Sequence, residues 1–507
     1  MVARSPSTGA VLAIAFFAIV VLVRTSLPLL DGDVWWHLRA GETILRDGAI
    51  PSMDSWTIAG AGLPWVSQDW LSNVIMAALY SVHDEWGATL LSLAFGAIAV
   101  AAFVVLWAAI RRQRPTGSTL GRVLVLSAGL VVAAPVLGVR VQTVDLLMIA
   151  LSVWLLWGYL ADRRARWLVG LPILAIIWAN THAGWPLLFA LGGAVVVGES
   201  LDRGLGRQVG ERHPLGWHQV AALAGALVAC VPALLMNPNG TRLLLYPFAT
   251  AGIEAHRDFL FEWSPPDIGT FPGQALIAFL VVVVVPTLLV GHRHLRSAEM
   301  LWLGGLSVLS LSAIRFVIAI GPIGAAVAAV ALAPAMADRG WLRTDGIARM
   351  LDRPPRSGRL AAVNLVLACV LVAIGVAVAT ARTAPSAQTS AIHEAMPVEA
   401  TAVLADERPS SRIFNVYAWG GYIGRELPDS VVYIDGRSDI YGDGPIREYA
   451  EAIALERDPF EILDREVIDV VLFWPDTAFS EALDQHPAWR RLHDDSQAVI
   501  WVRESGG

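Results

Sequence analysis

Long apolar runs, separated by short loops that carry arginine, make up most of the first 381 residues. The first run, residues 9–30, is long enough to cross a hydrocarbon core of about 30 Å, which takes roughly 20 helical residues. Further runs cover residues 86–110, 120–138, 141–160, 167–179, 185–199, 217–236, 274–290, 300–311, 316–336 and 360–381. We therefore expect an α-helical polytopic membrane protein with about eleven transmembrane helices.

The composition supports this expectation. Charged residues make up 16% of the chain and hydrophobic residues 55%, whereas soluble domains carry roughly 25% charged residues. A purely soluble enzyme is excluded, and a net charge of -7 argues against nucleic acid as a partner. The two cysteines, Cys230 and Cys369, lie inside apolar runs, so neither a disulfide framework nor a CxxC site is expected.

The arginines orient the predicted helices. They fall in alternate loops, as the positive-inside rule requires of cytoplasmic loops: Arg4, then 111–114, 163–166, 203–212, 293–296 and 339–359. The arginine-bearing loops all fall on one side of the membrane if residues 67–83, an amphipathic stretch, lie in the membrane interface and do not cross it. The first run has no small-residue cleavage site after it and is predicted to be retained. We expect a multi-pass protein of the plasma membrane whose C-terminal tail is extracytoplasmic.

The tail has a soluble composition and alternating strand and helix patterns. Strands are predicted at 412–417, 431–435, 467–474 and 498–502, and helices at 398–407, 445–454 and 477–485. The predicted organisation is a transmembrane domain over 1–381, with a long first outward loop over 31–85, and a small extracytoplasmic α/β domain over 382–507. Residues 383–390 are interpreted as a polar linker.

The first outward loop concentrates ionisable and aromatic side chains. It carries Asp31, Asp33, His37 and Asp69 together with the tryptophans Trp35, Trp36, Trp56 and Trp65. Ionisable groups near a membrane are costly, so their accumulation predicts a functional site. Tryptophan favours the headgroup layer, and Trp35, Trp36 and Trp65 are expected to set the depth of the loop. The alternative is a solvated acidic loop that helps to set the topology.

Polar residues also recur at the outward ends of other predicted helices. The main ones are Arg140, Asp145, His182, Glu262 and Arg315. Arg140 and Arg315 interrupt apolar stretches on the side where the positive-inside rule disfavours arginine, although such residues also snorkel to water. His182 fits either a hydrogen-bonded turn or a substrate contact.

These residue types suit the transfer of a sugar from a lipid phosphate. That reaction needs a base to take the proton of the acceptor hydroxyl and cations to stabilise the leaving phosphate. It needs no second carboxyl as an acid, unlike glycoside hydrolysis. Arg140, His182 or Arg315 would act electrostatically on the phosphate. A divalent metal, Mg²⁺ or Mn²⁺, held by Asp33 stays open, because no spacing specifies metal ligands.

The loop sequence DGDVWWHLRAGETILRDGAIPSMDSWT followed by PWVSQDWL resembles the first outward loop of bacterial GT-C superfamily glycosyltransferases, and FNVYAWGGYIGRELPDSVVYIDGRSDIYG is similar to a C-terminal segment of the same proteins. The resemblance implies that Asp33, or alternatively Asp31, is the catalytic base or a metal ligand, and that Asp69 is a second acidic position. The chain lacks the WWDYG signature of oligosaccharyltransferases, which argues against transfer to asparagine.

The combined hypothesis is an integral membrane glycosyltransferase that uses a polyprenyl-phosphate-linked sugar donor and an extracytoplasmic lipid, glycan or protein acceptor. The predicted catalytic residues are Asp33, Asp69 and His37. The predicted substrate-binding residues are Arg140, His182, Arg315, Asp31, Glu262 and Trp36. In the tail, Asp435, Arg437 and Asp439 fit either a structural ion-pair network or an acceptor site.

Two alternatives come from other classes of protein. A transporter or flippase of lipid-linked glycans would bind its cargo near the bilayer midplane, and Asp145 and Arg24 are the charged residues interpreted as lying in mid-helix. A non-catalytic scaffold of the cell envelope would bind a partner through the tail.

Overall fold

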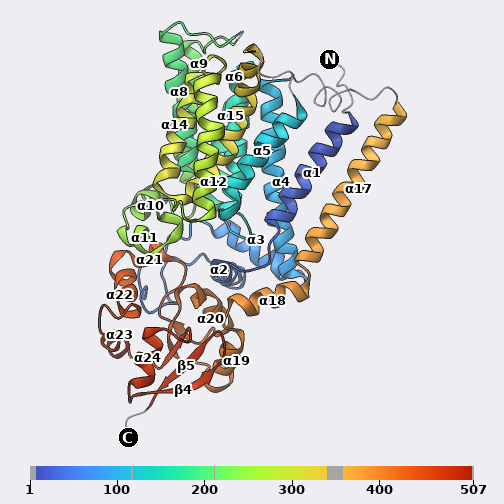
Figure 1. Ribbon diagram of the computed structural model, residues 1–507. Coiled ribbons are helices and arrows are strands. Elements are labelled where there is room, and N and C mark those ends of the chain that lie inside the picture. Colours follow the sequence, from blue (N-terminus) through green and yellow to red (C-terminus); the bar gives the residue numbers. More distant parts are fainter. Residues whose placement is uncertain (1–6, 116–117, 211, 340–357, 505–507) are drawn as a thin grey trace. The chain divides into compact units, whose positions relative to one another are not determined.

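The computed structural model describes residues 7–115, 118–210, 212–339 and 358–504 (Figure 1). These residues form two compact units. The membrane unit comprises Met1–Leu27, Ser92–Gly240 and Phe261–Arg382, and the α/β unit comprises Pro28–Leu91, Thr241–Leu260 and Thr383–Gly507. Arg4 and residues 340–357 of the predicted cytoplasmic arginine cluster lie outside the described residues.

The membrane unit consists of long apolar helices. Within the described residues, eight helical stretches are long and apolar enough to cross a membrane: Thr8–Thr25 (α1), Gly87–Gln113 (α4), Thr119–Val136 (α5 and η1), Gln142–Asp162 (α6), Trp217–Leu234 (α9), Phe271–His294 (α12 to η4), Ile314–Met336 (η5 and α15) and Gly358–Arg382 (α17). The other three predicted spans also form helices, α7 (Arg166–Thr181), α8 (Pro186–Gly204) and α14 (Ser297–Ser312). These are shorter or end in charged residues. The chain is therefore a multi-pass membrane protein, as its sequence predicts.

Small residues let the helices of this unit approach closely. A Cβ atom built on Gly129 of α5 (Thr119–Ala133) would lie 2.5 Å from the carbonyl oxygen of Gly321 in α15 (Val317–Asp338), and the reverse approach is equally close. Backbones that touch in this way are typical of helix crossings in membranes. The pairs α1 with α17 and α8 with α14 also lie side by side (Figure 1).

The α/β unit is built on a five-stranded sheet in the order β2-β1-β3-β5-β4. The strands are β1 (Arg412–Asn415), β2 (Val431–Val432), β3 (Val470–Phe473), β4 (Trp489–Asp494) and β5 (Val499–Arg503). β1 pairs in parallel with β2 and β3, while β5 runs antiparallel to β3 and β4. Four of these strands were predicted; β4 was missed.

Helices surround this sheet. The tail contributes α18 (Pro385–Ala395), α19 (Val398–Glu407), α20 (Gly420–Glu426), α21 (Ser438–Tyr441), α22 (Asp443–Ile453), α23 (Pro459–Arg465) and α24 (Ala478–Gln485). The interpretation of 383–390 as a linker was wrong, because Pro385 begins a helix there. Two helices come from Thr241–Leu260, α10 (Thr241–Ala251) and α11 (Glu254–Phe259).

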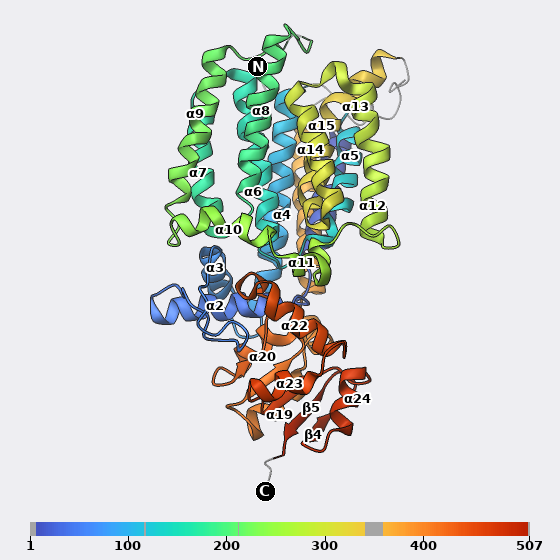
Figure 2. The same cartoon turned by 90° about the vertical axis from the view of Figure 1, so that its left-hand side faces the viewer.

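The first long loop, residues 31–85, belongs to the same unit as the tail. It forms α2 (Asp33–Asp47) and α3 (Trp70–Tyr80), which pack against each other (Figure 2). The segment between them extends the sheet: the backbone N–H groups of Ile58 and Ala59 donate to the carbonyl oxygens of Val432 and Tyr433, at 2.8 and 3.0 Å. The edge strand β2 is therefore covered by the loop. α3 has eleven residues, too few to span a bilayer.

Candidate functional site

Asp33 is the first residue of α2, where the helix dipole favours a negative charge. A carboxylate oxygen of Asp31 accepts a hydrogen bond from the Asp33 backbone N–H at 2.9 Å, so Asp31 fixes the start of the helix. The Trp36 indole, one turn further on, donates to Oδ1 of Asp33 at 3.3 Å. Three predicted site residues thus form one local cluster.

The Asp33 carboxylate is half-buried against a turn of the tail. A Cβ atom built on Gly436 would lie 1.8 Å from Oδ1 of Asp33. A side chain at this position would force the Asp33 carboxylate to shift. Burial raises the pKa of Tyr417 well above its usual value, and the negative charge of Asp33 raises it further.

His37 and Asp69, the other two predicted catalytic residues, are brought together. Nδ1 of His37 lies 2.7 Å from Oδ1 of Asn73 and 3.3 Å from Oδ2 of Asp69. The Asn73 amide donates to Asp69 at 3.2 Å. His37 and Asp69 are only 3% and 2% exposed. This buried cluster joins α2 to the start of α3 and fixes the orientation of the imidazole.

The tail motif around Arg437 forms a buried ion-pair network. Nη2 of Arg437 lies 2.7 Å from Oδ2 of Asp435 and 2.9 Å from Oδ1 of Asp54 in the first loop. The Tyr441 hydroxyl donates to Asp435 at 2.6 Å. Burial alone would raise the pKa of Asp435, but the charge and hydrogen bonds of Arg437 outweigh it, so this pKa is lowered. Of the two interpretations of this motif, a structural ion-pair network or an acceptor site, Asp435 and Arg437 form the ion-pair network.

The tryptophans of the loop pack inside the α/β unit. The guanidinium of Arg437 lies 4.7 Å from the ring centroid of Trp56 and 4.5 Å from that of Trp65. Trp35 meets Tyr422 edge to face at 5.0 Å. Trp35, Trp36 and Trp65 are 2%, 8% and 3% exposed. The prediction that these three set the depth of the loop in the headgroup layer was therefore wrong, because their rings are enclosed by protein.

The remaining predicted site residues lie in the membrane unit. Nδ1 of His182 lies 2.6 Å from Oδ2 of Asp145, and the Trp178 indole donates to Oδ1 of Asp145 at 2.6 Å. His182 and Asp145 are both buried. Asp145 is in the first turn of α6 and Arg24 in the last turn of α1, so neither is a mid-helix charge. The interpretation that supported a transport site was wrong on this point.

Arg140 and Arg315, the two arginines predicted to face outward, contact the same short segment, η2 (Phe261–Trp263). Arg140 forms an ion pair with Glu262, which joins two predicted substrate-binding residues. The guanidinium of Arg315 lies 4.1 Å from the ring centroid of Trp263. Both cations are therefore held by η2.

Among the residues that the structure describes, no group of three or more His, Cys, Asp or Glu side chains is placed to hold a metal ion. Asp33 has Asp31 as its nearest acidic neighbour in the chain, but Asp31 is turned to the backbone of the helix start. We assign no metal ligand.

Sequence reasoning missed the pairing of Arg437 with Asp54 and missed Tyr246 of α10. Asp54 is distant in sequence from Arg437, and a single sequence carries no signal for that pairing. Arg242 and Tyr246 of α10 are spaced by four residues, a spacing that puts two side chains on one face of a helix. That signal was available.

Comparison with known proteins gives structural matches only. No family model and no curated protein sequence matches the chain. The oligosaccharyltransferase of Archaeoglobus fulgidus in the apo form has a TM-score of 0.50 and 11% identity, covering 91% of this chain and 69% of that chain. ArnT from Cupriavidus metallidurans bound to undecaprenyl phosphate has a TM-score of 0.48 and 14% identity, covering 97% of each chain. The Archaeoglobus fulgidus oligosaccharyltransferase AglB in complex with an inhibitory peptide and a dolichol-phosphate gives 0.47 and 12%, over 91% of this chain and 69% of that chain.

At these identities the likeness concerns the fold. The chain has a fold similar to that of the Archaeoglobus fulgidus oligosaccharyltransferase, which agrees with the fold that the resemblance of its first loop implies.

Proposed function

We propose that the protein is an integral membrane glycosyltransferase that takes a sugar from a polyprenyl-phosphate donor and transfers it, outside the cytoplasm, to a hydroxyl group of a lipid, glycan or protein. The observation that carries this proposal is the placement of Asp33. Its carboxylate begins α2, is half-buried, and lies against the glycine turn of the tail. The GT-C fold supports the same reaction class by analogy.

In this proposal Asp33 is the general base. The acceptor hydroxyl gives its proton to the carboxylate while its oxygen attacks the anomeric carbon of the donor sugar. The bond from that carbon to the phosphate oxygen breaks, and the phosphate leaves with the electron pair. Arg140, His182 and Arg315 would bind the phosphate charge. His37 and Asp69 would hold α2 in place behind the base.

The test is Asp33→Asn in the full-length protein reconstituted in liposomes. The assay follows transfer of labelled sugar from a panel of undecaprenyl-phosphate hexoses and pentoses to a membrane acceptor fraction. We expect the rate to fall by about 10²-fold or more, since Asn accepts no proton. Asp47→Asn, on the exposed end of the same helix, is the matched control. Retained transfer by a well-folded Asp33→Asn protein removes the base assignment.

The same preparation separates the alternatives. A flippase moves the labelled lipid between leaflets without forming a new glycosidic bond, and a scaffold does neither. The outward orientation of the α/β unit is tested in intact cells with an impermeant maleimide, in a background without Cys230 and Cys369. Asp406→Cys in that unit is expected to label, whereas Arg203→Cys, in a predicted cytoplasmic loop, is expected to label only after permeabilisation.

A further inference from the structure

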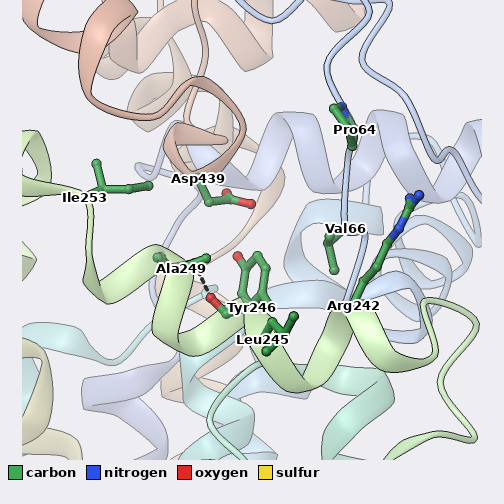
Figure 3. A pocket seen from close by; sticks show the side chains of 9 residues that line it. Pro64, Val66, Arg242, Leu245, Tyr246, Ala249, Ile253 and Asp439 are labelled. Atoms are coloured by element: carbon green, nitrogen blue, oxygen red, sulfur yellow. Dashed lines mark hydrogen bonds between the residues drawn. The ribbon is translucent and has the colours of Figure 1, made fainter.

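The α/β unit contains a pocket of about 370 Å³ that none of the roles above uses (Figure 3). Three segments line it: the first loop through Pro64 and Val66, α10 with the residues that follow it, and Asp439 of α21. This volume is in the range of pockets for small molecules, about 300–1,000 Å³. Segments distant in sequence thus build one concave surface.

One end of the pocket is polar. Figure 3 shows the hydroxyl of Tyr246 facing Asp439. Nε2 of Gln68 donates a hydrogen bond to that hydroxyl at 3.3 Å, so the proton of Tyr246 is left for Asp439. Burial raises the pKa of Asp439 and raises that of Tyr246 well above its usual value. The pair can both donate and accept hydrogen bonds, as sugar hydroxyls require.

The pocket also has a cation. Arg242 lies one helical turn before Tyr246 on α10, and its side chain is exposed. Within the described part of the chain, no carboxylate forms an ion pair with it. A guanidinium that is open to solvent beside a pocket favours a phosphate, which it binds through two parallel hydrogen bonds.

The rest of the wall is apolar. Val66, Leu245, Ala249 and Ile253 line it between and around the polar groups. An apolar lining with a few converging polar groups fixes the orientation of a small ligand. A sugar ring fits this pattern, because its C–H faces are apolar and its rim carries hydroxyls.

We propose that this pocket binds a sugar phosphate, with the sugar hydroxyls at Tyr246 and Asp439 and with Arg242 as the phosphate contact that the α/β unit contributes, in addition to the phosphate contacts proposed for the membrane unit. The inference rests on the proposed function and deepens it, because it assigns residues to the substrate headgroup. Gln68, which positions Tyr246, precedes Asp69 of the His37 cluster directly. The same chemistry is present in a lipid-linked donor and in a phosphorylated glycan.

The experiment measures the affinity of the full-length protein in nanodiscs for undecaprenyl phosphate and for a panel of undecaprenyl-phosphate hexoses and pentoses. We expect at least one sugar-bearing lipid to bind more tightly than undecaprenyl phosphate. Tyr246→Phe and Asp439→Asn should each reduce that gain by about tenfold without changing the affinity for the bare lipid. Arg242→Gln should weaken both. Wild-type affinities in all three variants would overturn the proposal. It would also be overturned if no sugar-bearing lipid of the panel bound more tightly than undecaprenyl phosphate.

Arg257→Gln is the matched control, since Arg257 is exposed on the neighbouring α11 and does not line the pocket. Competition by soluble sugar 1-phosphates identifies the source of the ligand. If soluble sugar 1-phosphates compete with the lipid in the wild type but not in Arg242→Gln and Asp439→Asn, the pocket recognises the headgroup itself. If they compete equally well in these variants, the proposal is contradicted.

Transfer assays keep the two proposals apart. If Asp33→Asn transfers normally while the pocket variants lose binding, the base assignment fails and the pocket stands. If the wild type transfers sugar and the pocket variants do so with unchanged KM, the pocket assignment fails and the proposed function stands.

Discussion

Gly436 in the tail lies so close to Asp33 that a Cβ atom on the glycine would come within 1.8 Å of the carboxylate oxygen Oδ1. The position of the proposed base is thus set by a residue near the other end of the chain. Contacts of this kind join the first loop and the tail in one structural unit.

Gly436→Ala tests this relationship. The added methyl group must displace the Asp33 carboxylate, and a displacement of about 1 Å costs on the order of 10²-fold in rate. We expect kcat for sugar transfer to fall while the protein remains folded, as judged by its melting temperature. Gly444→Ala is the control, because nothing lies within 4 Å of its added Cβ. Equal activity of the two variants would contradict the assigned contact.

Arg437→Gln tests the buried network. The substitution leaves Asp54 and Asp435 without their cation, and breaking a buried ion pair costs about 3–5 kcal/mol. Unfolding of the α/β unit can be followed by tryptophan fluorescence, since Trp56 and Trp65 contact the guanidinium. Arg490→Gln removes an exposed pair with Glu504 and should change stability by less than about 1 kcal/mol. Similar losses in both variants would show that burial does not decide the cost.

The pH dependence of stability should have opposite signs at two nearby carboxyls. The pKa of Asp435 is lowered on folding, so its contribution is complete above about pH 3.9, the unfolded value, and is lost as pH falls through the folded pKa. The pKa of Asp439 is raised, so its contribution is complete below about pH 3.9 and is lost as pH rises through the folded pKa.

Unfolding midpoints of Asp435→Asn and Asp439→Asn, measured against the wild type over this pH range, check both signs. The wild-type advantage over Asp435→Asn should shrink in acid. Stability of Asp439→Asn relative to the wild type should increase as the pH rises. A parallel response of the two variants would contradict the assigned environments.

Glu262→Gln tests whether the Arg140 ion pair competes with a phosphate. Removing the carboxylate charge makes the guanidinium more available, and a partly exposed pair is worth up to about 1 kcal/mol. Affinity for undecaprenyl phosphate, measured in nanodiscs, should therefore increase by up to about fivefold, and Arg140→Gln should reduce it. Glu254→Gln, an exposed carboxylate on α11, is the control. Weaker binding by Glu262→Gln would assign that carboxylate to the ligand site itself.

The membrane helices could be predicted because lipid imposes a strong pattern: apolar runs of sufficient length and arginine on alternate loops. The strands β1, β3 and β5 are buried apolar runs and were equally visible. β4 was missed because its Arg490 and Arg491 are exposed and its sequence is polar. α18 was missed because serine, threonine and alanine composition suits a linker and a helix alike.

The candidate site was predicted only where it is local. Asp33, Trp36 and His37 are neighbours on one helix and Asp31 lies two residues before its start, and the loop pattern pointed to all four. The pairing of Asp54 with Arg437 and the joining of Tyr246 with Asp439 are long-range contacts, which no periodicity encodes. The tryptophans were misassigned because an amphipathic indole gives the same sequence signal whether it meets lipid or a guanidinium.

The covering of strand β2 by Ile58 and Ala59 affects the order in which the protein is made. The ribosome releases this loop early, yet its hydrogen-bond partners come from the last part of the message. At about 5–20 residues per second, the loop must wait for roughly tens of seconds before the β2 carbonyl groups and Arg437, the partners of its backbone donors and of Asp54, are synthesised. Assembly of the candidate site is therefore one of the final events of biosynthesis.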